Sequence, residues 1–134
     1  MNNREKSSLE LTPAPEMTLI DEGGDLSVLI KHDYYSSDTE QGRLLLGSFI
    51  DALTDCGDTL LKVILVDSAV NLLQDPYFSS RIGKLLSISR YSYICEESLA
   101  AYDIDYSTHD NILVCSASDI SLQIIQAGHL LTLE

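Results

Sequence analysis

The stretch Tyr91-Ser92-Tyr93-Ile94-Cys95-Glu96-Glu97-Ser98-Leu99-Ala100-Ala101-Tyr102 changes character at its only cysteine. Residues 91–94 form a short segment rich in residues that favour β-strands. Residues 96–102, directly after it, have residues that favour a helix. We therefore predict a strand that runs straight into a helix, with Cys95 at the junction. A strand followed at once by a helix is typical of proteins in which the two kinds of element alternate.

The sequence on either side of this stretch repeats the same alternation. Short apolar runs, each separated from the next by an amphipathic segment, predict strands at Leu26 to Ile30, Lys62 to Val66, Tyr91 to Ile94, Asn111 to Val114 and His129 to Leu133. Four helices are expected between these five strands. Such alternation indicates βαβ units and a parallel sheet.

End signals and apolar faces support the longer helices. The expected N-caps are Ser37, Asp75 and Ser118, and the expected C-terminal glycines are Gly57 and Gly128. Ser37 with Glu40 three residues later forms a possible capping box, and Pro76 suits a first helical residue. The expected apolar faces are Leu45, Phe49, Ile50 and Leu53; Phe78, Ile82, Leu85 and Leu86; and Ile120, Ile124 and Ala127.

These elements predict the fold class and the domain boundaries. We expect an α/β protein, a three-layer α/β/α sandwich with a mainly parallel five-stranded sheet, over residues 26–134. Residues 1–25 contain Pro13, Pro15 and the Gly23-Gly24 pair, and we expect a flexible N-terminal tail or an edge segment there. The chain of 134 residues suits one folded domain.

Charge and hydropathy exclude several classes of function. The formal net charge of −13, with no cluster of basic residues, predicts that nucleic acid and anionic membranes are repelled. No apolar run approaches the roughly 20 residues of a membrane span, and no secretory signal is recognisable, so a cytoplasmic location is expected. The acidity itself indicates either solubility or a basic partner protein.

The cysteines and histidines do not predict a metal site. Cys56, Cys95 and Cys115 are widely separated, as are the three histidines, and we expect reduced thiols and no metal. Neither a phosphate-binding glycine loop nor a nucleotide fingerprint occurs, so no cofactor is predicted.

Ligands of parallel α/β sheets bind outside the carboxyl ends of the strands. This rule selects four segments: His32 to Asp38, Asp67 with Ser68, Cys95 to Ser98, and Cys115 to Ser118. Within them we predict Cys95 as the catalytic residue. The candidate substrate-binding residues are His32, Ser68, Ser98 and Cys115.

Several of these segments resemble the DsrE/DsrF-like family. Residues 37–55, SDTEQGRLLLGSFIDALTD, are similar to its first loop and helix, and the similarity continues through Val66-Asp67-Ser68-Ala69-Val70. The stretch 94–104, ICEESLAAYDI, resembles the family's cysteine loop, specifically that of YedF-type proteins linked to selenium metabolism.

This resemblance implies a sulfurtransferase-like carrier that holds sulfane sulfur, or selenium, on Cys95 for a partner protein. It also implies homo-oligomers. Ser98 stands where the family often has a second cysteine, and Asp103 stands where it has a glycine. Aspartate tolerates the left-handed backbone conformation of such a glycine better than most residues do. The Cys-Pro-x-Pro motif that YedF-type proteins often carry in a further domain does not occur.

The residues around Cys95 leave the chemistry open. A helix start favours a thiolate, whereas the negative charges of Glu96 and Glu97 oppose it and repel an anionic sulfur donor. Cys115 is either a partner thiol or a small buried residue. A non-catalytic binding or assembly module is the alternative to the carrier, and a flavodoxin-like protein with a small cofactor is a third hypothesis.

Overall fold

The computed structural model describes residues 25–134. The tail or edge segment predicted for residues 1–25 lies outside the described residues, apart from Asp25. The strands are β2 (Leu26–Ile30), β3 (Leu60–Leu65), β4 (Tyr91–Cys95), β5 (Ile112–Cys115) and β6 (His129–Leu133). The helices are α1 (Glu40–Asp55), α2 (Ser79–Ile88), α3 (Glu96–Ala101) and α4 (Ala117–Ile125), with 3₁₀ turns η1 (Gly57–Thr59) and η2 (Asp67–Leu73).

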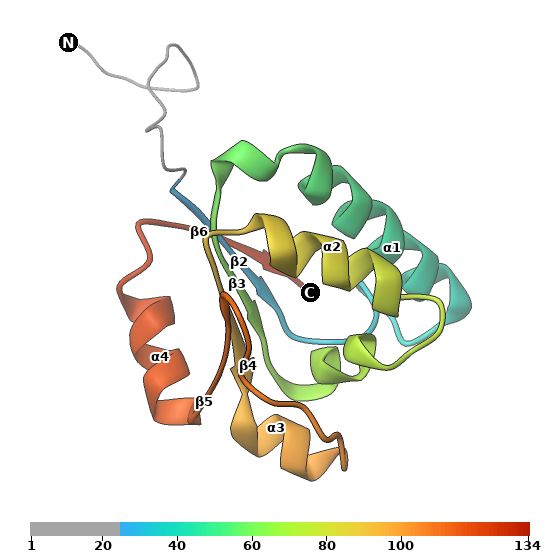
Figure 1. The fold of residues 1–134 in the computed structure, drawn as a ribbon. Coiled ribbons are helices and arrows are strands. Elements are labelled where there is room, and N and C mark those ends of the chain that lie inside the picture. Colours follow the sequence, from blue (N-terminus) through green and yellow to red (C-terminus); the bar gives the residue numbers. More distant parts are fainter. Residues whose placement is uncertain (1–24) are drawn as a thin grey trace, which may run out of the picture.

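The five strands form one sheet in the order β5-β4-β3-β2-β6, and every pair of neighbours is parallel. The chain moves outward from β2 to β5 and then crosses back to place β6 on the other side of β2. Right-handed crossovers that run in opposite directions place their helices on opposite faces of a sheet. Figure 1 shows this arrangement, with α1 and α2 on one face and α4 on the other. The predicted α/β sandwich is confirmed.

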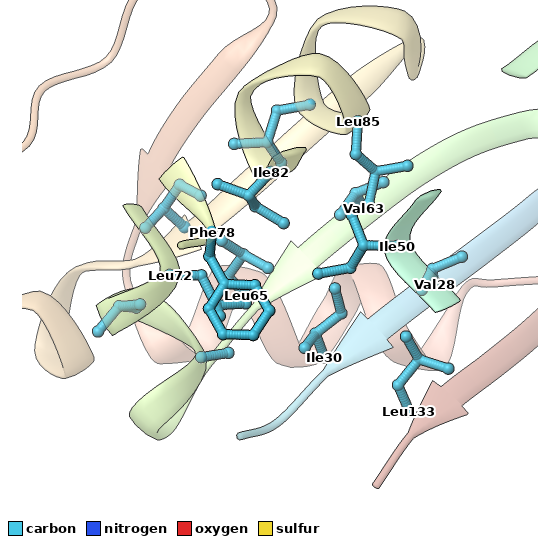
Figure 2. Packing of buried hydrophobic residues seen from close by; sticks show 14 of the residues in the cluster. Val28, Ile30, Ile50, Val63, Leu65, Leu72, Phe78, Ile82, Leu85 and Leu133 are labelled. Carbon is cyan, nitrogen blue, oxygen red and sulfur yellow. The ribbon is translucent and has the colours of Figure 1, made fainter. Parts of the chain in front are cut away.

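One face of the sheet, here called the α1/α2 face, carries the larger core. Side chains from alternate positions of the strands pack against Ile50 of α1, Phe78 and the apolar side of α2 (Figure 2). All four residues predicted for the α2 face are buried; these are Phe78, Ile82, Leu85 and Leu86. In α1 the most buried leucine is Leu46 rather than the predicted Leu45.

The opposite face, here called the α4 face, has a much smaller core. Its buried residues are Leu29, Ile64, Tyr93, Cys95 and Ile120. Only α4 covers this face within residues 25–134, and its outward residues Leu122 and Ile125 are exposed. Cys95 therefore lies in the thinner of the two cores.

All three predicted N-caps were wrong. Helix α2 begins at Ser79 with Phe78 as its N-cap, whereas Asp75 and Pro76 lie in the turn before it, where Asp75 accepts a hydrogen bond from the Tyr77 amide.

The other two caps were wrong by two residues. Thr39, not Ser37, caps α1 by accepting a hydrogen bond from the Gly42 amide, while the Ser37 hydroxyl bonds to Thr39 instead. Ser116, not Ser118, caps α4 through the Asp119 amide. Several residues with hydroxyl side chains lie near the start of each helix. The backbone conformation determines which of them can accept a hydrogen bond from an unpaired amide of the first turn.

The predicted C-terminal glycines do not cap their helices either. Helix α1 ends at Asp55 with Cys56 as its C-cap, and Gly57 begins the turn η1. Helix α4 ends at Ile125 with Gln126 as its C-cap, two residues before Gly128. Both glycines instead lie in the short connections that lead into β3 and β6.

Asp103 has a left-handed backbone with φ of 56°. The chain reverses there, and the Ile104 amide returns to donate to the Leu99 carbonyl at 2.9 Å. The expectation that Asp103 can adopt a left-handed backbone is confirmed. The turn ends α3 after six residues and separates it from the long connection to β5.

Candidate functional site

The carboxyl ends of β2, β3, β4 and β5 meet at one edge of the sheet because the strands are parallel. The segments that follow them are the loop 31–39, η2, helix α3 and the cap of α4. Figure 1 shows α3 at this edge, directly beyond β4. All the candidate site residues predicted from the sequence lie on these segments or at the strand ends.

Two thiols lie side by side at this edge. Cys95 and Cys115 are the last residues of β4 and β5, and they are direct partners in the register of the two strands. Partners in adjacent strands share a face, and both cysteines pack in the cluster of the α4 face. Cys95 is buried, with 5% of its surface exposed, and Cys115 is partly buried. The structure thus brings together two of the predicted site residues.

The side chain of Glu97, on α3, contacts both the Cys95 thiol and the first residue of α4. One of its carboxylate oxygens, Oε1, lies 3.9 Å from the Cys95 sulfur and accepts a hydrogen bond of 2.9 Å from the Ala117 amide at the start of α4. Because α4 covers both cysteines, this single carboxylate joins α3 to the helix that shields them. The negative charge predicted to oppose an anionic donor is therefore in direct contact with Cys95.

The surroundings of Cys115 favour its neutral form. Burial raises the pKa of this thiol, and the carboxylates of Asp119 and Glu96 raise it further. A protonated thiol is a weak nucleophile at neutral pH. Cys115 is therefore a slow nucleophile unless the pH rises or a partner changes its surroundings.

Ser98 lies on the other side of α3, against η2. Its hydroxyl oxygen accepts a hydrogen bond of 2.8 Å from the Asp67 amide, at a residue with φ of 52°. Tyr102 donates its hydroxyl to Asp67 Oδ1 at 3.2 Å. Desolvation and this hydrogen bond raise the pKa of Tyr102, so the phenol remains a donor. Ser98 and Tyr102 hold α3 against the end of β3.

Ser68 and His32 belong to a further part of the edge. The Ser68 hydroxyl accepts a hydrogen bond of 3.2 Å from the Asp33 amide, which ties the loop after β2 to η2. The His32 ring stacks on Tyr34 with centroids 4.8 Å apart. Among residues 25–134 no hydrogen bond connects His32 or Ser68 to either thiol. The predicted residues consequently form two groups, a thiol pair and a rim of hydroxyl, acidic and aromatic side chains.

The described part of the chain offers no gathering of three histidine, cysteine or acidic side chains suited to a metal ion. A cavity of about 300 Å³ between α1 and β6 is lined by Tyr35, Phe49, Leu53 and Leu131 among others, away from the thiols. None of the helices in residues 25–134 is long and apolar enough to cross a membrane.

Sequence reasoning missed the contact between Glu97 and Ala117 and the bond between Tyr102 and Asp67. The sequence shows Glu97 only as a negative charge beside Cys95, because nothing in it reveals that α4 begins next to α3. Asp67 was selected by its place after a strand, but its partner Tyr102 follows 35 residues later.

The same fold, a parallel five-stranded sheet between layers of helices, occurs in solved proteins of low sequence identity. The solved structure of ychN protein from E. coli superimposes with a TM-score of 0.56 and 15% identity, covering 81% of this chain and 98% of that one. A conserved protein of unknown function, BT1422 from Bacteroides thetaiotaomicron, gives a TM-score of 0.54 and 13% identity over 81% of this chain and 95% of its own. At these identities the similarity is one of fold alone.

No protein-family model matches the sequence, and a search of curated proteins finds no relative.

Proposed function

We propose that the protein is a sulfur carrier of DsrE-like fold in which Cys95 holds a sulfane sulfur atom as a persulfide and passes it to a partner protein. One observation carries this proposal: Cys95 ends β4 at the start of α3, with a second thiol, Cys115, as its partner in the neighbouring strand. The resemblance of residues 94–104 to the cysteine loop of YedF-type proteins supports it and adds selenium as an alternative cargo.

The backbone at Cys95 suits this role. Cys95 is the N-cap residue of α3, and no side chain caps that helix. The first amides of a helix have no partner within the helix and are available to a negatively charged group nearby. A persulfide anion on Cys95 would lie at this end of α3.

Burial of Cys95 limits the donors that can reach it. A sulfur donor must be small, or α3 and α4 must separate where Glu97 joins them. Separation at the thin α4 face exposes little apolar surface, which makes local opening there less costly than opening the larger core. We therefore expect the donor and acceptor proteins to dock over α3 and α4, and the net charge of −13 favours partners with basic surfaces.

The experiment is mass spectrometry of the intact protein after incubation with inorganic polysulfide. Cys56 is exposed and would react independently, so a Cys56→Ser background is used throughout. We expect the background protein to gain sulfur and a further Cys95→Ala substitution to abolish the gain. Equal sulfur uptake by both proteins, or no uptake by either, would contradict the carrier function.

A second candidate is a non-catalytic binding module, in which the rim of Asp33, Asp67 and Tyr102 docks a partner and Cys95 is a buried core residue. The contact of Glu97 with the Cys95 sulfur favours it, because the carboxylate repels anionic donors. Alkylation of Cys95 with iodoacetamide across pH separates the two candidates. A thiol that reacts far more slowly than free cysteine throughout the range supports the module, and a thiol that matches free cysteine or exceeds it supports the carrier.

A further inference from the structure

The register of β4 and β5 places Cys115 directly beside Cys95. Cys115 can form a disulfide with Cys95, whereas the hydroxyl of Ser98 cannot. We propose that Cys115 is the resolving thiol of the site: it attacks a persulfide on Cys95, forms a Cys95–Cys115 disulfide and releases sulfide. This inference rests on the proposed carrier function and extends it, because it gives the bound sulfur a second fate besides transfer to a partner.

The spacing of the two residues permits the bond. Neighbouring strands lie about 4.7–4.9 Å apart, and the α-carbons of disulfide-bonded cysteines are usually about 4.4–6.8 Å apart. Both side chains pack in the same cluster, on the α4 face. The Cys115 sulfur lies 3.8 Å from the Leu113 carbonyl oxygen, and attack on Cys95 replaces this weak contact.

The position of β5 in the sheet makes a small adjustment possible. It is an edge strand of four residues with β4 as its only neighbouring strand within residues 25–134, and its outer side is held at Ile112 by His109 and at Val114 by the Thr108 hydroxyl. Both cysteines are the last residues of their strands, where the backbone leaves the sheet. A shift at these ends breaks few sheet hydrogen bonds.

The reaction balances without an outside oxidant. The Cys115 thiolate attacks the inner sulfur of the Cys95 persulfide, the bond between the two sulfurs of the persulfide breaks, and the outer sulfur leaves with the electron pair as hydrosulfide. The outer sulfur is reduced to sulfide and the Cys115 sulfur is oxidised to the disulfide level, whereas the Cys95 sulfur, already bonded to sulfur, keeps its oxidation state. The proton lost by Cys115 goes to solvent, and an external dithiol is required to reduce the disulfide again.

The groups around Cys115 set the pH at which the step runs. Asp119 of α4, Glu96 of α3 and Tyr93 of β4 face it, and burial together with the two carboxylates raises the pKa of its thiol. Resolution is therefore slow at neutral pH, where the persulfide survives for transfer, and faster at alkaline pH.

The test uses the full chain with Cys56→Ser, alone and combined with Cys115→Ser or Cys115→Ala. Each protein is loaded with inorganic polysulfide, the excess is removed, and intact mass and released sulfide are followed at neutral and alkaline pH. We expect the parent to lose its added sulfur and finish two hydrogens lighter than the reduced protein, with one sulfide released for each disulfide. Both Cys115 variants should keep the sulfur at least about tenfold longer, because they lack the neighbouring intramolecular nucleophile.

The outcomes separate the two proposals. If the parent and both Cys115 variants gain sulfur and keep it equally long, the resolving role is overturned while the carrier function stands. Should peptide mapping find the sulfur on Cys115, or a disulfide that omits Cys95, the resolving role is also overturned. Absence of sulfur uptake in all three proteins overturns the carrier function and the resolving role with it.

Discussion

The two faces of the sheet bury very different amounts of apolar side chain. Eighteen buried residues form the core of the α1/α2 face, whereas five form that of the α4 face. Burial of apolar area is the main favourable contribution to folding, so the first face supplies most of the stability. The second face holds both cysteines of the candidate site under a single helix. The comparison indicates that the candidate site lies on the face with the smaller core, where we expect local opening to cost less free energy.

The largest effect is expected from Phe78→Ala on the α1/α2 face. Phe78 is fully buried between the sheet and the helices, and its truncation leaves a cavity (Figure 2). We expect the free energy of unfolding to fall by about 3–5 kcal/mol. Urea denaturation measures it, with the exposed Tyr77→Ala as a neighbouring control. A loss no larger than that of Tyr77→Ala would show that this core is not the principal source of stability.

Ile120→Ala tests the α4 face in the same way. Ile120 is the buried residue of α4 in the cluster that contains Cys95. We expect a loss of about 2–3 kcal/mol, at the lower end for such a truncation because the surrounding core is small. Cys95 should also react faster with iodoacetamide in native buffer. If Phe78→Ala accelerates alkylation of Cys95 more than Ile120→Ala does, the proposed difference between the faces is wrong.

The third prediction concerns the ion pair that joins α1 to the start of α2. Arg43 donates to Asp75 at 2.8 Å, and its guanidinium lies over the Phe78 ring. Burial alone would raise the pKa of Asp75, but the hydrogen bond from Arg43 and those from the backbone lower it below 3.8. We expect Arg43→Met to cost about 1 kcal/mol near neutral pH.

The pH dependence of this cost has a definite sign. Because the pKa of Asp75 is lower in the folded protein, its contribution is complete above the unfolded value of 3.8 and is lost as the pH falls through the folded value. The difference between wild type and Arg43→Met should therefore shrink in acid. Lys31→Met removes the more exposed pair with Glu134 and serves as the control, with almost no cost expected. A difference that grows in acid would contradict this assignment.

The smallest effect is expected from Glu97→Gln at the α4 face. Glutamine retains an oxygen for the Ala117 amide, so stability should change by less than about 0.5 kcal/mol. The negative charge beside Cys95 disappears, and one charge at such a distance contributes about 1 kcal/mol in water. Alkylation by anionic iodoacetate should therefore accelerate about two- to fivefold more than alkylation by neutral iodoacetamide. Equal acceleration by both reagents, or the same result in the remote control Glu40→Gln, would exclude a charge effect.

The periodicity of the sequence determined the secondary structure and the fold class. The first and last strands were predicted with their observed bounds, Leu26–Ile30 and His129–Leu133, because short apolar runs between turn residues identify buried parallel strands. The junction at Cys95 and the left-handed Asp103 were also predictable, since both depend on neighbouring residues. Local signals were insufficient to identify the helix caps: Thr39 caps α1 instead of Ser37, and Ser116 caps α4 instead of Ser118.

Only the tertiary structure decided which candidate residues meet. Cys95 and Cys115 are twenty positions apart in sequence, and they become neighbours because β5 pairs with β4 in one particular register. The same packing buries Cys95 beneath α4, turns Ser98 toward Asp67, and brings Glu97 to the start of α4. These contacts depend on the order of the strands and on which face of the sheet each helix covers. Local periodicity in the sequence predicts neither of these. The sequence thus located the Cys95 thiol at the end of a strand. The packing of α4 determined that this thiol is buried, and the pairing of β5 with β4 determined that Cys115 is its neighbour.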